Sequence, residues 1–250
     1  MIATDAPRAL TFSLLRCLAD GEFHSGEVLA SQFGVTRATV HNALQDVESY
    51  GLTLYSVRGR GYRLARPLQW LDADLIRAGL GEARDDLHVE ILDCAASSNA
   101  LLLQRAAQGA ASGTLLAVEW QSAGRGRRGR AWHSALGDAL TFSLLWRFDS
   151  GLAALSGLSL AVGIAMMRAL AELGVPGVGL KWPNDVLLND GKLAGILIEA
   201  QGDMLGPSAV VIGIGLNLVV PDELRERIEQ PVSALAAEGR PAPERSLVLA

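Results

Sequence analysis

A run of alternating glycine and arginine constrains this chain more than any other segment. Residues 124–130 read Gly-Arg-Gly-Arg-Arg-Gly-Arg, and Ala131 and Trp132 follow them. Apolar runs at residues 114–118 and 140–146 flank the motif, which predicts a loop between two β-strands. The alternatives are a disordered arginine–glycine tail or a plain solvated loop, but a disordered tail would not be enclosed by two strands. We therefore place this loop inside a globular domain.

The composition of the loop indicates its chemistry. Glycine lets the backbone approach a ligand closely, and arginine supplies forked donors that match phosphate and carboxylate. Four neighbouring positive charges repel one another unless an anion is present. We therefore expect a flexible loop that folds over an anionic ligand. The loop is not a P-loop, because no Gly-Lys-Ser/Thr sequence follows it.

A second motif, Lys-Trp-Pro-Asn-Asp at residues 181–185, is followed by apolar residues 186–188 and then by residues 191–199. This pattern predicts a strand, a tight turn and a strand. Lys181 and Lys192 are the only lysines of the chain, and the other 20 basic residues are arginines. A compact ammonium fits where a planar guanidinium does not, which is one physical reason for lysine here. Chance placement of two rare residues is the alternative.

Two weaker signals lie elsewhere in the same region. Residues 210–218 predict a buried strand in which Gly213 and Gly215 either admit a ligand to the backbone or serve packing alone. Residues 93–99 end a strand and begin a helix. There Ser97, Ser98 and Asn99 are either helix N-caps, which spacing alone favours, or polar contacts for a neutral ligand.

The first 66 residues differ from the rest of the chain in charge and in pattern. They carry seven arginines against six acidic residues, whereas the remainder carries 15 basic and 21 acidic residues. Leucines at positions 10, 14, 15 and 18 predict a first helix. A second helix is predicted from an N-cap at Ser25 to Gly34, and a third from an N-cap at Thr36 to Gly51. The last two helices and their glycine-containing turn form a helix-turn-helix pattern, whose second helix lies in a DNA major groove.

A basic hairpin is predicted directly after these helices. Residues 52–57 and 62–64 are the strands, and Arg-Gly-Arg-Gly at 58–61 is the tip. Such a wing is suited to phosphate contact, although a small helical cap without DNA contact is the alternative. We predict a winged helix-turn-helix over residues 1–66 and a second domain over residues 67–250. The predicted DNA-binding residues are Ser25, Thr36, Arg37, Thr39, His41, Asn42, Gln45, Arg58 and Arg60.

The composition excludes several other classes of protein. A net charge of −5 excludes a globally basic nucleic-acid coat. Two distant cysteines, Cys17 and Cys94, provide neither a metal cluster nor a disulfide framework. Residues 1–5 lack the pattern of a secretory signal. Residues 150–167 carry no charge, but they are rich in Ala, Ser and Gly without flanking anchors, so we predict a buried core helix rather than a membrane span. We expect a cytoplasmic protein without a membrane partner.

Residues 124–132, 181–185, 191–199 and 213–217 follow the order and spacing seen in biotin–protein ligases, and the chain resembles that family over nearly its whole length. Residues 21–27 and 58–62 resemble the winged helix of the bifunctional class, which is both ligase and biotin-operon repressor. The resemblance implies an α/β (α+β) catalytic domain of the class II synthetase and biotin ligase type. It also implies that the family's C-terminal SH3-like barrel is absent from these 250 residues.

The resemblance implies a two-step reaction with biotin, ATP and Mg²⁺. Biotinyl-5′-AMP forms first, and a lysine of a biotin carboxyl carrier protein of acetyl-CoA carboxylase then takes the biotin. It further implies that the adenylate is a corepressor that promotes a homodimer on operator DNA, and that residues 221–232 order over the adenine.

The same resemblance assigns roles to individual residues. It implies catalytic roles for Arg127 and Lys192, and a Mg²⁺ ligand at Asp185. The implied biotin-binding residues are Ser97, Ser98, Asn99, Gln121, Arg125, Gly126, Arg127, Lys192, Gly195 and Gly213. The implied ATP- or adenylate-binding residues are Arg125, Arg127, Arg130, Trp132, Lys181, Asn184, Asp185, Lys192 and Asn217.

Three other functions remain to be weighed against the bifunctional one. The first is a ligase whose winged helix does not bind DNA. The second is a biotinyl-5′-AMP sensor without turnover. A lipoate ligase is less well supported, because that group usually lacks both the arginine loop and the winged helix.

Overall fold

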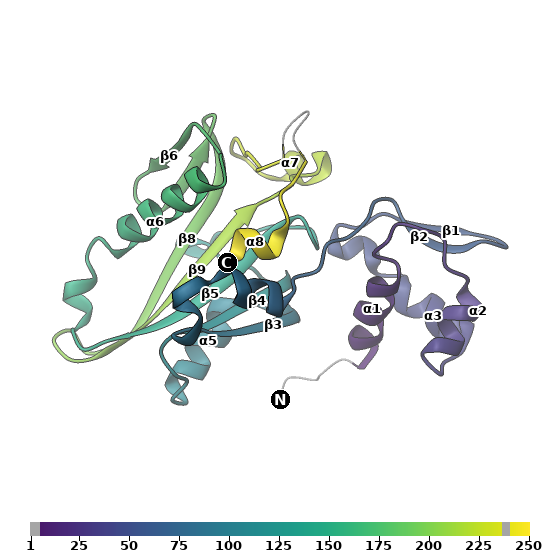
Figure 1. Cartoon of the computed structure of the whole chain (residues 1–250), viewed down its shortest axis with the longest axis horizontal. Coiled ribbons are helices and arrows are strands. Elements are labelled where there is room, and N and C mark those ends of the chain that lie inside the picture. Colours follow the sequence, from purple (N-terminus) through teal and green to yellow (C-terminus); the bar gives the residue numbers. More distant parts are fainter. Residues whose placement is uncertain (1–5, 237–240) are drawn as a thin grey trace. The chain divides into compact units, whose positions relative to one another are not determined.

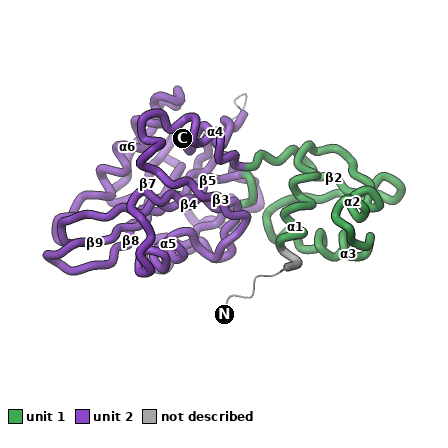
Figure 2. The backbone as a smooth tube through the Cα atoms, turned by 60° about the horizontal axis from the view of Figure 1, so that its bottom comes forward, with its two compact units in different colours: residues 1–70, 135–137 green, residues 71–134, 138–250 purple. Residues whose placement is uncertain are grey.

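The computed structural model describes residues 6–236 and 241–250 (Figure 1). Residues 1–5, on which the expectation about a secretory signal rests, lie outside the described residues. The chain divides into two compact units (Figure 2). Unit 1 comprises residues 1–70 and 135–137, and unit 2 comprises residues 71–134 and 138–250.

Unit 1 therefore extends to Trp70, beyond the boundary predicted at residue 66. The Trp70 ring lies 6.2 Å from that of Phe12, and the Arg16 guanidinium lies 4.1 Å from its centroid. The backbone N–H of Leu68 donates to the carbonyl of Ala19 at 2.9 Å. These contacts bind the segment after residue 66 to the first helix of unit 1 and to the turn that follows it.

Unit 1 contains the helix-turn-helix and hairpin that the sequence predicts. Its helices are α1 (Ala6–Cys17), α2 (Gly26–Gln32) and α3 (Arg37–Leu44), and its hairpin pairs β1 (Leu54–Val57) with β2 (Gly61–Leu64). Ser25 Oγ accepts the N–H of Glu27, and Thr36 Oγ1 accepts that of Thr39, so both predicted N-caps are confirmed. The third helix is shorter than predicted. It ends at Leu44, and a separate 3₁₀ turn, η1 (Val47–Tyr50), carries the chain to Gly51 in the left-handed region.

The hairpin is joined to the connection between α1 and α2. The N–H groups of His24 and Tyr62 each donate to the other residue's carbonyl at 2.9 Å. Gly61 has a φ of +100°, and a Cβ there would lie 1.9 Å from the carbonyl oxygen of His24. Only glycine fits this junction, because other residues rarely adopt that φ and a side chain would collide.

Unit 2 is built on one mixed sheet. Within the described residues, seven strands follow the order β3-β4-β5-β9-β8-β7-β6, with β3 parallel to β4 and the other pairs antiparallel. The strands are β3 (His88–Ala95), β4 (Thr114–Gln121), β5 (Ala139–Phe148), β6 (Val178–Lys181), β7 (Asp185–Leu188), β8 (Gly191–Gly202) and β9 (Ser208–Asn217). The arginine loop connects β4 to β5, as predicted, and the tight turn predicted before residue 191 is formed by residues 189–190, between β7 and β8. Residues 182–184 form a further turn, between β6 and β7, which the sequence did not predict.

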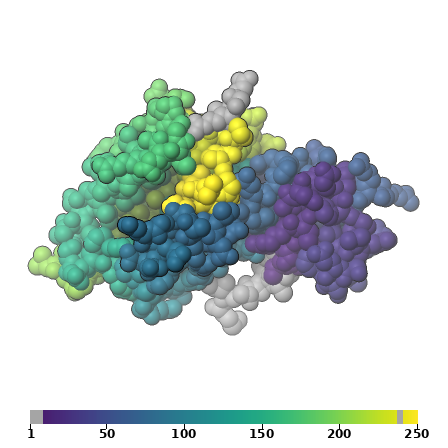
Figure 3. Space-filling model, in the orientation of Figure 1, coloured from purple at the N-terminus to yellow at the C-terminus, as the bar shows by residue number. Residues whose placement is uncertain are grey.

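Helices cover both faces of this sheet. On one face α5 (Ser98–Ala107) packs against β4, β5 and β9. The other face carries α4 (Ala73–Gly79), α6 (Leu158–Glu172) and α8 (Arg245–Leu249). Figure 3 shows the C-terminal segment, in yellow, against the blue segment that contains α4. The remaining short helices are η2 (Gly81–Asp85), η3 (Arg127–Gly129), η4 (Leu152–Leu155) and α7 (Asp222–Arg227).

The prediction of a buried core helix over residues 150–167 is wrong. The helix α6 begins only at Leu158, and only Gly163 and Leu170 of it are buried. Leu160 and Ile164 are 40% and 46% exposed. A single sheet packs against this helix, so one side of it faces away from the core. None of the helices in the described part of the chain is long and apolar enough to span a membrane.

A buried ion pair joins the start of unit 2 to its last helix. Glu119 Oε2 lies 2.7 Å from Arg245 Nη1, and the two side chains are 0% and 1% exposed. The other carboxylate oxygen accepts the N–H of Leu71 at 2.7 Å. Arg245 Nη2 also donates to the carbonyl of Ala139 at 3.1 Å. Burial of both charges is tolerated because each makes further hydrogen bonds.

Candidate functional site

Unit 2 contains a cavity of about 700 Å³. Its walls come from the start of α5, the arginine loop, the β6–β7 turn, β8, β9 and residues 227–232. All of the residues predicted to bind biotin or the nucleotide line it: Ser97, Ser98, Asn99, Gln121, Arg125, Gly126, Arg127, Arg130, Trp132, Lys181, Asn184, Asp185, Lys192, Gly195, Gly213 and Asn217. Segments from opposite ends of the domain sequence thus meet in one place, and the individual roles of these residues remain predictions.

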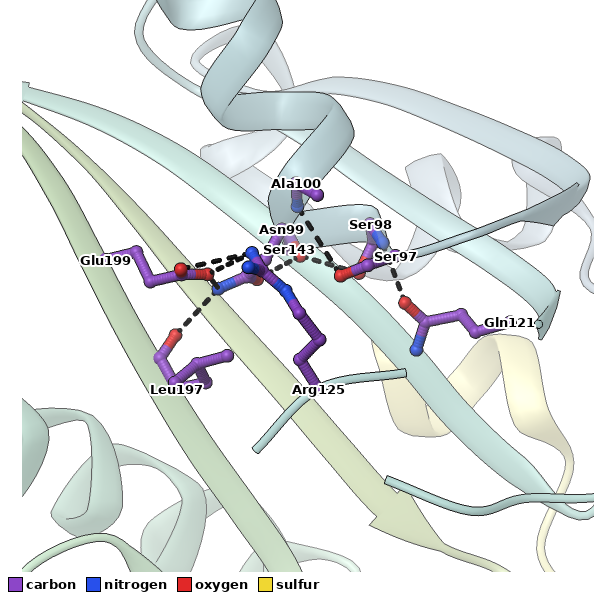
Figure 4. A network of polar contacts seen from close by, with 9 residues as sticks. All are labelled: Ser97, Ser98, Asn99, Ala100, Gln121, Arg125, Ser143, Leu197 and Glu199. Atoms are coloured by element: carbon purple, nitrogen blue, oxygen red, sulfur yellow. Dashed lines mark hydrogen bonds and ion pairs between the residues drawn. The ribbon is translucent and has the colours of Figure 1, made fainter. Parts of the chain in front are cut away.

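The polar end of the cavity lies at the start of α5 (Figure 4). Ser97 Oγ accepts the N–H of Ala100 at 3.4 Å, so Ser97 is the helix N-cap. The N–H of Ser98 donates to Gln121 Oε1 at 2.7 Å. Ser97, Ser98 and Asn99 are each less than 5% exposed. The N-cap interpretation therefore accounts for Ser97, whereas the next two side chains are buried beside the cavity.

Asn99 is held in one orientation. Its Nδ2 lies 3.1 Å from the carbonyl oxygen of Leu197, which can only accept, so Nδ2 is the donor and Oδ1 must accept. Ser143 Oγ lies 2.6 Å from that Oδ1 and therefore donates to it. The hydroxyl of Ser98, 2.7 Å from Ser143 Oγ, then donates to Ser143. This chain of donors fixes the direction of the hydrogen bonds that join Ser98, Ser143 and Asn99.

The two glycines of β9 make room for side chains of the site. A Cβ at position 213 would lie 2.0 Å from Asn99 Oδ1. A Cβ at position 215 would lie 2.4 Å from Cε2 of Trp132. Gly213 and Gly215 therefore let a polar and an aromatic side chain lie directly on the strand.

The arginine loop is folded back on itself. The N–H of Gly126 donates to the carbonyl of Arg130 at 2.7 Å, and that of Trp132 donates to Gly124 at 2.8 Å. Arg125 forms an ion pair with Glu199, Nη2 to Oε2 at 2.9 Å. Arg127 Nη1 donates to Asn184 Oδ1 at 3.3 Å, a neutral partner. Two of the predicted ligand-binding arginines, Arg125 and Arg127, thus have different partners in this structure.

Lys192 lies on β8, with its ammonium 2.8 Å from Asp185 Oδ1. The ammonium is also 5.9 Å from the ring centroid of Trp132. The backbone of Lys192 is held on both sides, because its N–H donates to Pro231 and its carbonyl accepts from Ser233, both at 2.9 Å. Residues 231–233 therefore fix the position of Lys192 along β8.

The acidic groups of the cavity suit a Mg²⁺ ion that is bound mainly by a nucleotide, and they do not form a metal site made of protein side chains alone. The described residues contain no group of three or more His, Cys, Asp or Glu side chains that could hold a metal ion alone. Mg²⁺ that travels with a nucleotide takes most ligands from phosphates and water and needs one or two carboxylates. Asp185 supplies one such carboxylate within the cavity.

Sequence reasoning assigned no role to two residues of this network. Ser143 is completely buried among apolar neighbours of β5. Glu199 follows the apolar residues 196–198 of β8 and binds both Arg125 and Asn99. A polar residue inside an apolar strand is the signal that was available for both. Residues 227–230 also line the cavity, in the segment that was predicted only as a loop over the adenine.

The residues predicted to contact DNA all lie in unit 1 and are exposed. Some of them contact other side chains of unit 1. Arg37 pairs with Glu27 at 3.0 Å, and Tyr62 Oη lies 3.4 Å from Nδ1 of His41. The Arg60 guanidinium lies 4.0 Å from the centroid of the Phe23 ring. Arg58 lies at the exposed tip of the hairpin.

Comparison with known proteins identifies both units. A profile of the family described as "Biotin/lipoate A/B protein ligase family" matches residues 92–217, and a profile described as "HTH domain" matches residues 11–63. The chain belongs to the biotin/lipoate A/B protein ligase family. The catalytic fold and the N-terminal helix-turn-helix that the sequence predicted are thereby confirmed.

Curated relatives match across both units. The chain is 43% identical over 220 residues to the bifunctional ligase/repressor BirA of Salmonella typhimurium, covering 88% of this chain and 66% of that protein. It is 33% identical over 225 residues to the protein of the same name from Bacillus subtilis, covering 88% of this chain and 69% of the relative. The chain thus spans about two thirds of the length of these family members.

Two solved structures of biotin protein ligases share the fold. The ligase of Aquifex aeolicus in complex with biotin and ATP is 29% identical with a TM-score of 0.52, and the match covers 64% of each chain. The ligase of Leishmania major in complex with biotinyl-5-AMP is 26% identical with a TM-score of 0.52, covering 64% of this chain and 70% of that one.

Proposed function

We propose that this chain is a biotin–protein ligase and a biotin-responsive transcriptional repressor. In its enzymatic role it forms biotinyl-5′-AMP from biotin and ATP, and it transfers biotin to a lysine of a biotin carboxyl carrier protein. The observation that carries the proposal is the single cavity that gathers the arginine loop, Lys192 and the polar start of α5. Its volume lies within the range usual for small-molecule sites.

The polar end of the cavity suits the neutral ureido ring of biotin. Ser97, Ser98 and Asn99 offer hydroxyl and amide groups with little exposure to water, and Gln121 is held beside them. A site that hydrogen-bonds a buried polar ring rejects analogues that lack its polar atoms, because its own groups would then be unpaired.

The positive end of the cavity suits the two anions that must react. In the first step a biotin carboxylate oxygen attacks the α-phosphorus of ATP, and pyrophosphate leaves. In the second step a carrier lysine amine attacks the acyl carbon, and AMP leaves. Neither step needs a protein nucleophile. Lys192 and Arg127 act by neutralising and orienting the two anions, which otherwise repel each other.

The nucleotide lies in this proposal between the β6–β7 turn and residues 227–232. Asn184 is fixed there, since its Nδ2 donates to the carbonyl of Ile196 at 2.9 Å. Asp185 and the ATP phosphates would hold Mg²⁺, which supplies further neutralisation of the leaving pyrophosphate. Arg127, which has only the neutral Asn184 as a described partner, then moves onto the adenylate and keeps water from it.

Unit 1 is proposed to bind operator DNA through α3, with the β1–β2 hairpin on the phosphate backbone. Asn42 of α3 and Gln45, directly after this helix, are exposed and can form paired hydrogen bonds to adenine. In this proposal the adenylate promotes a homodimer, so that two copies of α3 meet two half-sites. The protein acts in the cytoplasm, where ATP, the carrier and the DNA are present together.

Mass spectrometry of the protein with biotin, Mg·ATP and a carrier domain tests the enzymatic proposal. The carrier is expected to gain the mass of one biotinyl group, with release of pyrophosphate. Absence of both products would contradict the proposed activity. Pyrophosphate release without carrier labelling would instead favour an adenylate sensor.

A gel shift with operator DNA from biotin synthesis genes tests the repressor proposal. Retardation is expected to increase when both biotin and ATP are present. If the DNA is not retarded, or is retarded equally with and without biotin and ATP, the repressor proposal is contradicted. The protein would then be a ligase whose winged helix does not respond to the adenylate.

A further inference from the structure

Among the described residues, Glu199 is the one whose carboxylate binds a side chain of the arginine loop. Both of its oxygens lie within 3.1 Å of Arg125 Nη2. Its Oε2 also accepts from Asn99 Nδ2 at 3.0 Å. Figure 4 shows the carboxylate beside both the Arg125 side chain and Asn99 at the start of α5. It therefore connects the loop to the polar end of the cavity.

The partner of Glu199 on the other side is itself rigid. Asn99 is 3% exposed and is fixed by Leu197 and Ser143, as described above. The carboxylate thus rests on a buried, fully oriented amide rather than on a mobile side chain. An arginine that binds such a carboxylate is held in one direction.

Two arginines of the loop, Arg125 and Arg127, differ in the kind of partner that they bind. Within the described part of the chain, Arg125 forms an ion pair, whereas the one described partner of Arg127 is the neutral amide of Asn184. A loop that must open and close over a ligand needs a fixed point about which its remaining residues move. Arg125 has the contacts of a fixed point, and Arg127 has those of a mobile donor.

We propose that Glu199 is a positioning residue that anchors the arginine loop through Arg125, also while the adenylate is bound. This inference rests on the proposed function. It divides the loop into an anchor at Arg125 and ligand-binding arginines from Arg127 onward. It also predicts whether removal of the Glu199 carboxylate strengthens or weakens adenylate binding. If the carboxylate merely competed with the ligand for Arg125, its removal would strengthen adenylate binding, whereas loss of an anchor weakens it.

The first experiment measures dissociation of biotinyl-5′-AMP from the full chain. Glu199→Gln is expected to release the adenylate about tenfold faster than the wild type, an effect within the range seen for coupled residues of one network. Glu199→Asp, which keeps the charge, should restore part of the retention. Glu172→Gln, an exposed glutamate of α6, is the matched control and should leave the rate unchanged.

A double-mutant cycle separates an anchor from a general structural effect. Arg125→Gln and Glu199→Gln should each accelerate release, and the double variant should be no faster than the quicker single variant. Multiplied effects in the double variant would overturn the proposal. So would release from Glu199→Gln at the wild-type rate or more slowly.

Trypsin cleavage provides a readout that needs no ligand. Trypsin cuts after arginine, and the anchored loop should be cut slowly. Cleavage within residues 125–130 should be about fivefold faster in Glu199→Gln, and unchanged in Glu172→Gln. Wild-type protein that does not retain biotinyl-5′-AMP would contradict the proposed function, whereas equal cleavage of wild type and Glu199→Gln would overturn the anchor alone.

Discussion

The ammonium of Lys192 lies 2.8 Å from Oδ1 of Asp185, with the two side chains 16% and 19% exposed. Asp185 is the first residue of β7 and Lys192 the second of β8, so a short hairpin brings them together. A partly buried pair of this kind holds the ammonium in place before any ligand arrives. Preorganised charge needs no rearrangement when negative charge develops in the reaction.

Lys192→Ala is therefore expected to slow adenylate formation about a hundredfold or more, the cost usual for one preorganised group. Lys192→Arg should not restore the rate, because a planar guanidinium does not replace a compact ammonium beside Asp185. Biotin- and ATP-dependent pyrophosphate release measures both variants. A Lys192→Ala rate near that of the wild type would show that the residue is structural.

Arg127→Gly is expected to loosen the hold on the adenylate without preventing its formation. The reactive adenylate should then escape and label lysines of bystander proteins, detected by streptavidin blotting of an added protein without a carrier sequence. Arg84→Gly removes an exposed arginine of η2 and serves as the control. Bystander labelling equal to the wild type would contradict the assignment of Arg127 to the ligand.

Gly213→Ala tests the polar end of the cavity. The new methyl group would lie 2.0 Å from Asn99 Oδ1, so Asn99 must move and its bonds to Ser143 and Glu199 must break. We expect biotin affinity to fall about tenfold or more, measured by calorimetry, since buried polar groups lose their partners. Gly179→Ala is the matched control, because a Cβ there meets nothing within 4 Å. Unchanged biotin affinity in Gly213→Ala would exclude a role for Asn99 in this site.

Much of this architecture could be predicted because its signals are local. Ser25 and Thr36 are helix caps that a short sequence window specifies. The arginine loop is enclosed by two apolar runs, which form the strands β4 and β5. The residues that meet in the cavity were identified by the resemblance to the biotin–protein ligases, which rests on compact motifs, and not by local spacing.

The rest depends on contacts that are distant in sequence. Glu199 binds Arg125 across 74 residues, and Arg245 binds Glu119 across 126 residues. Neither pair leaves a local pattern in a single sequence. The misjudged helix over residues 150–167 has a related cause. The absence of charge in this segment predicts a buried helix. Only one face of α6 packs against the sheet, however, and the segment's own sequence does not show whether another element covers its other face.

The buried pair of Glu119 and Arg245 leads to a prediction for stability. Arg245→Ala leaves a buried carboxylate without its charge partner and is expected to lower the free energy of unfolding by about 3–5 kcal/mol. Arg77→Ala breaks an exposed pair with Asp74 and should cost less than about 1 kcal/mol.

Urea unfolding followed by tryptophan fluorescence measures these differences, because four of the five tryptophans lie in unit 2. The double variant Glu119→Leu with Arg245→Met replaces both charges by apolar groups, and it should recover most of the stability that Arg245→Ala loses. Equal losses for Arg245→Ala and Arg77→Ala would show that the pair is not what joins Leu71 and β4 to the last helix.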